Sequence, residues 1–371
     1  MRVKRSIPII INADESVYKT LVAYRDVMNR LSGICFNGGK FLRKVPLHNA
    51  GYHKCKGVVS SQMVCFAERK VAGFYTATIK NKRRPSKPVV FVSPRADFLI
   101  RDKGSDASFP MDGSLSLWTV DGRKRYSYTV PKAFQNAFQD ALKKDSLCIY
   151  YKDGKMQASL CVSLEAPEPH GKKPVGVDRG EKNSIVAVDL SNRVFFETGK
   201  SYKVRNKRSF KKVKRLQKKF NAKKAQKGDT HSLRRALKRL KHKRKHRTTD
   251  FCRRTAKRFV DWLKPNSIIV FENLKGITKQ KRFKCLNRRL GNWPHYQLRT
   301  RIINKAEMRG IPWAEVDPSY TSKTCSRCGS QGNRDKNKFS CDCGYKKHAD
   351  VNAAINIRTK FTEGVKASSS Q

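Results

Sequence analysis

The sequence predicts a multidomain protein of mixed class, with a small antiparallel β-barrel and a helical insert in its first half and an α/β domain in its second half. Between residues 85 and 168, short runs rich in β-branched and aromatic residues are separated by Gly, Asp and Pro turns, a pattern typical of antiparallel strands. The segment APEPHGKKP at 166–174 has the composition of a linker. Apolar strands and helices follow it, which favours an α/β domain.

The elements of the first half support this division. Residues 3–11 form an apolar run that predicts a strand. Apolar side chains at helical spacing predict a helix over 15–35, and further helices are expected over 60–71 and 132–142. Strands are expected in the runs VVFVS, SLSLWTV, RYSYTV, LCIYYK and MQASLCVSLE. We assign residues 1–12 and 85–168 to the barrel and residues 13–84 to the helical insert.

The second half begins with three expected strands, VGVDRG, SIVAVDL and RVFFETG, joined by tight turns. A long basic segment at 203–258 follows, in which two apolar stripes at helical spacing flank the turn KGDT. It predicts a helical hairpin. Further on we expect a buried strand in SIIVFENL, a helix over 294–308, a strand in PWAEVDP and a helix over 351–360. Residues 362–371 have the composition of a disordered tail.

The net charge of the chain is its most unusual bulk property. Lys and Arg number 83 against 29 Asp and Glu, which gives +54 at pH 7. A surplus of this size destabilises a compact fold unless a polyanion neutralises it, and nucleic acid is the obvious counter-charge. A basic tail is the plain alternative, but the charge is spread along the whole chain. On the hairpin the basic side chains are expected to contact nucleic-acid phosphates; a solvated hairpin is the alternative.

The location expected from the sequence is the cytoplasm, in association with the nucleoid. No apolar run approaches the length of a membrane span. The start MRVKRSIPIII is basic and then apolar, but Asn12, Asp14 and Glu15 follow too soon for a signal peptide.

Four of the eleven cysteines, Cys325, Cys328, Cys341 and Cys343, form two closely spaced pairs, and the others are scattered. This pattern favours a metal site in a reducing compartment over a set of disulfides. Four thiolates suit a structural Zn²⁺, which supplies folding energy to a segment with almost no apolar core. Because the second pair is C-x-C, His348 is an alternative fourth ligand.

Three acidic residues stand at the ends of expected elements. Asp178 ends the apolar run VGVD, Glu272 ends IIVFE, and Asp350 opens the final helix. Carboxylates on neighbouring strand ends and a helix start can converge, and their mutual repulsion then calls for Mg²⁺ or Mn²⁺. Two such ions suit phosphodiester hydrolysis. Taken singly, each residue has a plain alternative: Asp350 as a helix cap, Asp178 as the partner of a lysine, Glu272 as a solvent-facing rim residue.

Other polar and aromatic residues are expected to be structural. Asp189, Glu197 and Glu315 lie on expected strands, and we expect them to pair with basic neighbours. Trp293, His295 and Tyr296 stand beside basic residues and could stack on bases. For Trp293, packing against the sheet is the preferred expectation.

The order VGVDRG, IIVFENL, SKTCSRCGSQ and FSCDCGYKKHADVNAAINI resembles the TnpB (OrfB) proteins of bacterial insertion sequences, which are related to type V CRISPR effectors. The resemblance covers 169–361; in the first half it extends only to layout and size. It implies an RNase H-like (RuvC) nuclease domain at 169–319 and 348–361, interrupted by a zinc ribbon at 320–347 that binds target nucleic acid. It also implies that the barrel is a wedge domain and that residues 13–84 are a recognition insert.

The same resemblance implies an RNA-guided DNA endonuclease. A guide RNA from the transposon end pairs with double-stranded target DNA beside a short transposon-adjacent motif, and Asp178, Glu272 and Asp350 match the family's catalytic carboxylates. Arg179, in place of an apolar residue, and the shortened C-x-C pair are departures that remove no ligand. Two alternatives stay open: an RNA-guided repressor or transposition accessory protein that does not cut, and a basic RNA-binding protein without a DNA target. A monomer is the favoured state.

Overall fold

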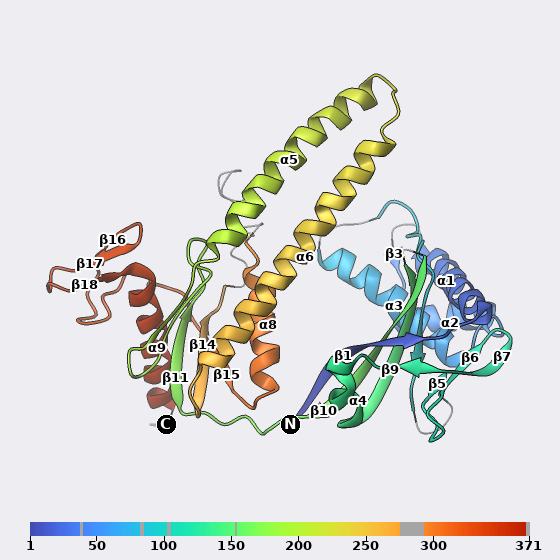
Figure 1. Cartoon of the computed structure of the whole chain (residues 1–371), viewed down its shortest axis with the longest axis horizontal. Coiled ribbons are helices and arrows are strands. Elements are labelled where there is room, and N and C mark those ends of the chain that lie inside the picture. The colour runs from blue at the N-terminus through green and yellow to red at the C-terminus, as the bar shows by residue number, and fades with distance from the viewer. Residues whose placement is uncertain (38–39, 82–84, 102–104, 153, 275–292, 369–371) are drawn as a thin grey trace. The chain divides into compact units, whose positions relative to one another are not determined.

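The computed structural model (Figure 1) describes residues 1–37, 40–81, 85–101, 105–152, 154–274 and 293–368. The chain divides into two compact units: residues 2–165, here called the N-terminal unit, and residues from 166 onward together with Met1, here called the C-terminal unit. Each is described by itself. No helix in the described part of the chain combines the length and apolar character needed to span a bilayer.

The N-terminal unit is built on an antiparallel sheet of five strands. Their order is β4 (Arg95–Leu99), β9 (Ala141–Lys152), β10 (Lys155–Glu165), β1 (Arg2–Ile11) and β8 (Tyr128–Thr129). A second sheet holds β5 (Ala107–Ser108), β6 (Leu115–Thr119) and β7 (Gly122–Tyr126), and β2 (Phe36–Asn37) pairs with β3 (Lys40–Phe41). Among the described residues β4 and β8 remain the edges of the larger sheet, so the expected closed barrel is wrong. A pattern of short strands does not decide whether edges pair.

Helices cover part of this unit. They are α1 (Glu15–Cys35), α2 (Lys44–Cys55), α3 (Ser61–Lys80), the 3₁₀ turn η1 (Lys132–Phe134) and α4 (Gln135–Gln139). The side chains of Asp14 and Ser60 cap α1 and α3 by accepting backbone N–H bonds. The buried stripe of α1, from Val17 to Leu31, confirms the helical spacing seen in the sequence.

Two local predictions for this unit are wrong. The helix expected over 132–142 ends at Gln139, because residues from Ala141 pair with β10 as strand β9. The run VVFVS is not a strand. Its backbone is held at Phe91, which exchanges two hydrogen bonds with the side chain of Asn29 on α1. A side chain from a distant helix therefore satisfies backbone groups that the sequence pattern assigns to a sheet.

The C-terminal unit contains a mixed sheet in the order β13 (Val194–Glu197), β12 (Ile185–Val188), β11 (Lys173–Asp178), β14 (Ser267–Glu272) and β15 (Trp313–Val316). The first three strands are antiparallel, and β11, β14 and β15 are parallel. The inward side chains of alternate positions pack against α6 (His231–Trp262) and α8 (His295–Glu307) on one face. On the other face Val186 and Val188 pack against α9 (Ala349–Ser368).

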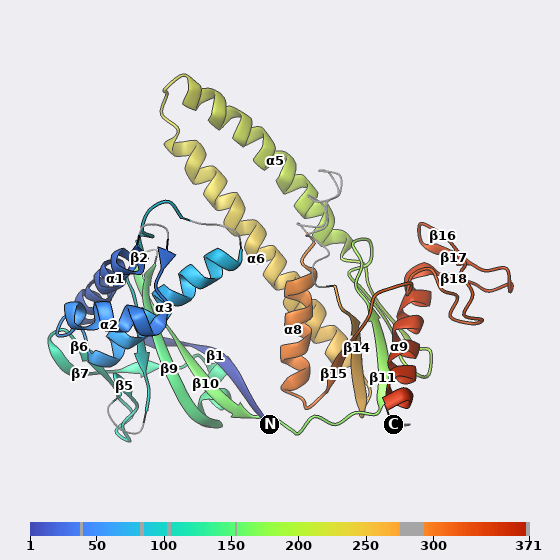
Figure 2. The same cartoon turned by 180° about the vertical axis from the view of Figure 1, so that it is seen from behind.

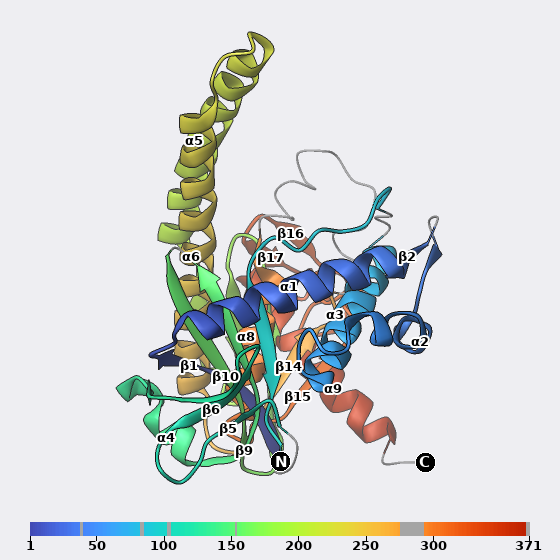
Figure 3. The ribbon, with the colours of Figure 1, turned by 90° about the vertical axis from the view of Figure 1, so that its right-hand side faces the viewer.

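The basic segment forms two long helices, α5 (Lys200–Ala225) and α6, which project from the sheet of their own unit as a hairpin (Figures 2 and 3). Only the end of α6 carries a run of buried side chains, from Phe251 to Val260. The rest of the hairpin exposes most of its basic side chains. Before α9, a three-stranded antiparallel sheet is formed by β16 (Asn333–Asp335), β17 (Lys338–Ser340) and β18 (Lys346–His348).

Candidate carboxylate site and cysteine cluster

Asp178 and Glu272 lie side by side at one edge of the mixed sheet. Strands β11 and β14 are parallel with Val177 opposite Phe271, so the next residue of each strand is a carboxylate. Val177 and Phe271 point into the core under α6 and α8. Because side chains alternate along a strand, Asp178 and Glu272 point to the opposite face, which α9 covers.

Asp350 reaches the same face from the first turn of α9, and its side chain is almost fully buried. Its carboxylate accepts a hydrogen bond of 2.7 Å from the amide of Asn183 and pairs with Arg334 at 2.5 Å. Helix α9 can approach the sheet closely because β11 has Gly176 where the two meet. Since α9 begins at Ala349, Asp350 is inside the helix and the simple cap interpretation does not describe it.

The charges of the three carboxylates act on one another. Burial raises the pKa of Asp178 well above its ordinary value, and the charges of Glu272 and Asp350 raise it further. Among the described residues, the three carboxylates do not form a group whose oxygens all lie within 4.8 Å of one another, as the sulfurs of the four cysteines do. The three residues therefore lie on one face of the sheet and interact electrostatically, while their role as one metal site stays a prediction.

Glu272 is held by polar neighbours. Burial raises its pKa, while the hydroxyl of Thr321, which donates a hydrogen bond to it, and the charge of Arg179 oppose that rise. Arg179 is itself buried, its pKa lowered to about 10 by burial, and it donates a bond of 2.6 Å to the backbone oxygen of Glu272. Its guanidinium also lies over the ring of Phe271.

Sequence reasoning missed four of these neighbours: Asn183, Thr321 and Arg334 were not singled out, and Arg179 was noted only as a departure. They carry no motif spacing, because each comes from a different loop or strand. The other acidic residues behave as predicted: Asp189 pairs with Arg193, Glu197 with Arg258 and Glu315 with Arg299, at 2.7, 2.8 and 2.8 Å.

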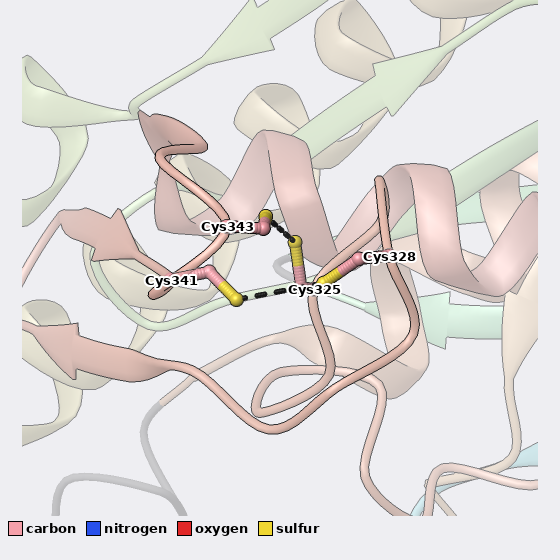
Figure 4. Close-up of side chains that lie close together, drawn as sticks. All are labelled: Cys325, Cys328, Cys341 and Cys343. Carbon is pink, nitrogen blue, oxygen red and sulfur yellow. Dashed lines mark hydrogen bonds between the residues drawn. The ribbon is translucent and has the colours of Figure 1, made fainter.

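The four cysteines of the ribbon come together, as Figure 4 shows. The Sγ atoms of Cys325 and Cys343 are 3.8 Å apart and those of Cys328 and Cys341 are 3.6 Å apart. These separations exceed a disulfide bond and match the ~3.8 Å between sulfurs that bind one tetrahedral Zn²⁺ with bonds of ~2.3 Å. The four thiols could therefore hold zinc.

The shortened C-x-C pair still forms a closed turn. Gly329 and Gly344 each follow the second cysteine of a pair with positive φ, and each donates its N–H to the carbonyl of the first cysteine. A backbone N–H from Ser330 lowers the pKa of Cys328 to about 6, which favours the thiolate that binds a metal. His348 does not join the cluster, because its Nδ1 accepts the N–H of Asp350 and its ring packs on Phe196.

The ribbon is tied directly to the carboxylate face. Asn352 and Asn356, one turn apart on α9, donate side-chain hydrogen bonds to the backbone of Thr324, and Asn352 also accepts the N–H of Ser326. Arg334, which pairs with Asp350, belongs to β16. The position of Asp350 therefore depends on the fold of the ribbon.

A groove of about 1120 Å³ runs along α5 beside this face. Its lining is largely apolar, with Tyr202, Phe210, Val213 and Trp293 among its residues. It also includes Glu181 and five lysines of α5, which are Lys203, Lys207, Lys211, Lys214 and Lys218. Burial lowers the pKa of Lys203, and the charges of Glu181, Glu197 and Asp350 oppose this, so one end of the groove is within electrostatic reach of the carboxylates. Trp293 lines the groove, which differs from the expected packing on the sheet.

Comparisons with known proteins agree with this arrangement. Residues 159–275 match the family model of a probable transposase (OrfB_IS605), and residues 295–357 match that of the Cas12f1-like TNB domain. A CRISPR-associated endodeoxyribonuclease Cas12f1 of Sulfoacidibacillus thermotolerans is 49% identical over 75 residues, 19% of this chain and 18% of that protein. A TnpB-like protein of Aquifex aeolicus is 42% identical over 96 residues, 24% of this chain and 31% of that protein.

These alignments thus span less than a third of the relatives' own lengths. Among solved structures, a Cas12f1–sgRNA–target DNA complex matches 92% of this chain and 81% of its own chain with a TM-score of 0.63 and 18% identity, which is a likeness of fold. The two family models lie in the segment that carries the carboxylates and the cysteine cluster. Residues 159–275 are therefore similar to the probable transposases of the OrfB_IS605 family model, and residues 295–357 are similar to the TNB domain of Cas12f1-like proteins.

Proposed function

We propose that this protein is an RNA-guided DNA endonuclease of an insertion sequence, which hydrolyses DNA at a guide-complementary target beside a short transposon-adjacent motif. In this proposal the C-terminal unit is an RNase H-like (RuvC) nuclease, and the ribbon binds target nucleic acid. The N-terminal unit then supplies the wedge sheet and, at 13–84, the recognition insert. The protein acts as a monomer at the nucleoid.

The single observation that carries the proposal is the grouping of Asp178, Glu272 and Asp350 on one face of the mixed sheet. Burial and the negative charges of Glu272 and Asp350 raise the pKa of Asp178, and a cation bound beside Asp178 would offset that repulsion. Hard oxygen donors fit Mg²⁺ or Mn²⁺ better than a softer metal. When bound, such ions lower the pKa of a water and stabilise the leaving oxygen of a phosphodiester.

The chain's own residues prepare this face. Asn183 and Arg334 fix both oxygens of Asp350, and Thr321 fixes one oxygen of Glu272, so the carboxylates keep their orientation. Arg179 anchors the end of β14 through the backbone of Glu272. Orientation of this kind matters because a reacting group displaced by ~1 Å can lose ~100-fold in rate.

The nucleic-acid part of the proposal rests on charge and on the relatives. The lysines of the α5 groove form a positive path that leads toward the carboxylates, and such contacts position a backbone without reading its sequence. Two relatives are named an endodeoxyribonuclease and a TnpB-like protein, and the structure with the similar fold is a complex with guide RNA and target DNA. We therefore assign guide RNA and double-stranded DNA as partners.

The test is cleavage of guide-matched DNA by the purified ribonucleoprotein in Mg²⁺. Asp178→Ala, Glu272→Ala and Asp350→Ala are expected to abolish cleavage while DNA is still bound. Asp317→Asn is the matched control, because Asp317 follows β15 on the same sheet but is exposed. Cleavage by Asp178→Ala at the parent rate would refute the metal-site assignment. Binding without cleavage by the parent would favour a guided repressor instead.

A further inference from the structure

A second group of metal-ligating side chains lies in the N-terminal unit, between helices α2 and α3. It consists of His48 on α2 and of Cys65 and Glu68 on α3, and one ligand atom from each lies within 4.8 Å of the other two. Cys65 and Glu68 are three residues apart, so they share one face of α3. Nδ1 of His48 is 2.8 Å from Oε2 of Glu68.

Glu68 is a buried carboxylate whose hydrogen bonding is incomplete in the described part of the chain. It is 0% exposed. His48 contacts one of its oxygens, while the other, Oε1, is buried and has no hydrogen-bond partner in the described part of the chain. A buried carboxylate oxygen without a partner is costly, because it has lost its water without gaining another interaction. A cation bound at Oε1 would remove that deficit.

The kind of cation follows from the donors. An imidazole nitrogen, a thiolate and a carboxylate oxygen together suit Zn²⁺, whereas Mg²⁺ and Ca²⁺ prefer oxygen alone. Zinc bonds of ~2.0 to 2.3 Å place tetrahedral ligands roughly 3.3 to 3.8 Å apart, which small side-chain rotations can reach from the present separations. The side chain of His48 is 43% exposed, so an ion and its remaining water ligand have access from solvent.

We propose that His48, Cys65 and Glu68 bind a zinc ion that joins α2 to α3, with a water in the fourth position. The ion takes the place of the proton in the hydrogen bond between His48 and Glu68, and it binds Oε1 of Glu68, which has no hydrogen-bond partner in the described part of the chain. It fixes two helices whose connection, from Lys56 to Ser60, contains the positive-φ residue Gly57. The proposal does not depend on nuclease activity. The competing interpretation is a plain His48–Glu68 hydrogen bond without any metal.

The zinc content of the purified protein distinguishes the proposed zinc site from a metal-free hydrogen bond between His48 and Glu68. After growth in zinc and washing with excess Mg²⁺, which keeps zinc off the carboxylate face, the parent is expected to hold about two zinc ions, one of them in the ribbon. His48→Gln, Glu68→Gln and Cys65→Ser are expected to hold about one. Cys65→His, which keeps a ligand at that position, is expected to retain the second ion.

Matched controls come from the same unit. His53 is an exposed histidine on α2, and Cys161 is a half-buried cysteine on β10, so His53→Gln and Cys161→Ser should keep both ions. Cys328→Ser, which breaks the ribbon site, should leave the ion on α2 and α3. A parent with zinc in the ribbon alone overturns the proposal, whatever the folding of the variants. So does an unchanged zinc content in Glu68→Gln.

Discussion

The close packing of α9 on β11 makes Gly176→Ala a sharp test of how Asp350 is positioned. A Cβ at residue 176 would lie 2.0 Å from the backbone oxygen of Ala354 and 2.8 Å from the N of Arg358. An ordinary carbon–oxygen contact is about 3.3 Å, so α9 has to retreat by roughly 1.3 Å. Gly176 has no positive φ that an alanine would strain, so the effect is steric.

Two consequences follow from that displacement. Overpacking of this kind costs about 1 to 3 kcal/mol of folding free energy. Because Asp350 lies one turn from Ala354 on the same helix, it moves with α9, and a shift of ~1 Å in a reacting group lowers the rate by ~100-fold. We therefore expect Gly176→Ala to remain folded, to bind guide RNA and to cut matched DNA about 100-fold more slowly.

The assay is single-turnover cleavage, with thermal unfolding measured alongside. Gly364→Ala is the control, because it adds the same methyl group to the same helix where a Cβ would meet no atom within 4 Å. It should cut at the parent rate and melt at the same or a higher temperature, since alanine favours a helix over glycine. A Gly176→Ala protein that cuts like the parent would show that α9 does not set the position of Asp350.

Three further predictions test the charges and the ribbon. The pKa values of Asp178 and Glu272 are raised in the folded state, so the folding stability that these carboxyl groups contribute at low pH is lost as the pH rises through those values. In EDTA at pH 8, Asp178→Asn should therefore melt at a higher temperature than the parent, and added Mg²⁺ should reduce this difference in melting temperature. Replacing Lys211, Lys214 and Lys218 by Gln should reduce the salt dependence of DNA binding, measured as the slope of log binding constant against log salt concentration, by about 2 to 3. An unchanged slope would show that the groove does not contact the DNA backbone. Cys328→Ser should lose the ribbon zinc and most cleavage, because Arg334 no longer holds Asp350; full activity without that zinc would contradict the coupling.

The parts of the fold that sequence predicted are those governed by local periodicity. The stripe of α1 and the helices of the basic hairpin follow from apolar spacing, and the strands that end at Asp178 and Glu272 follow from continuous apolar runs. Their parallel pairing then brings the two carboxylates to one edge. The cysteines were predictable because paired cysteines at short spacing are rare without a metal.

The rest depends on contacts between distant segments. Tertiary packing decides whether β4 and β8 pair and close a barrel. The residues near Phe91 do not form a strand because the side chain of Asn29 hydrogen-bonds to the backbone of Phe91. Asn183 and Arg334 meet Asp350 across 167 and 16 residues of sequence. The group of His48, Cys65 and Glu68 was invisible for the same reason, since its ligands come from two helices at no recognised spacing.

The most direct test of guided cleavage starts from the native locus. The protein is purified from cells that carry the whole element, and the co-purifying RNA is sequenced and tested for its ability to direct cleavage. We predict a discrete RNA from the transposon end that directs Mg²⁺-dependent cutting of matched DNA by the parent, while Asp178→Ala with the same RNA binds the DNA and leaves it intact. The absence of a discrete RNA, or a matched DNA that the parent leaves uncut, would contradict the proposed function.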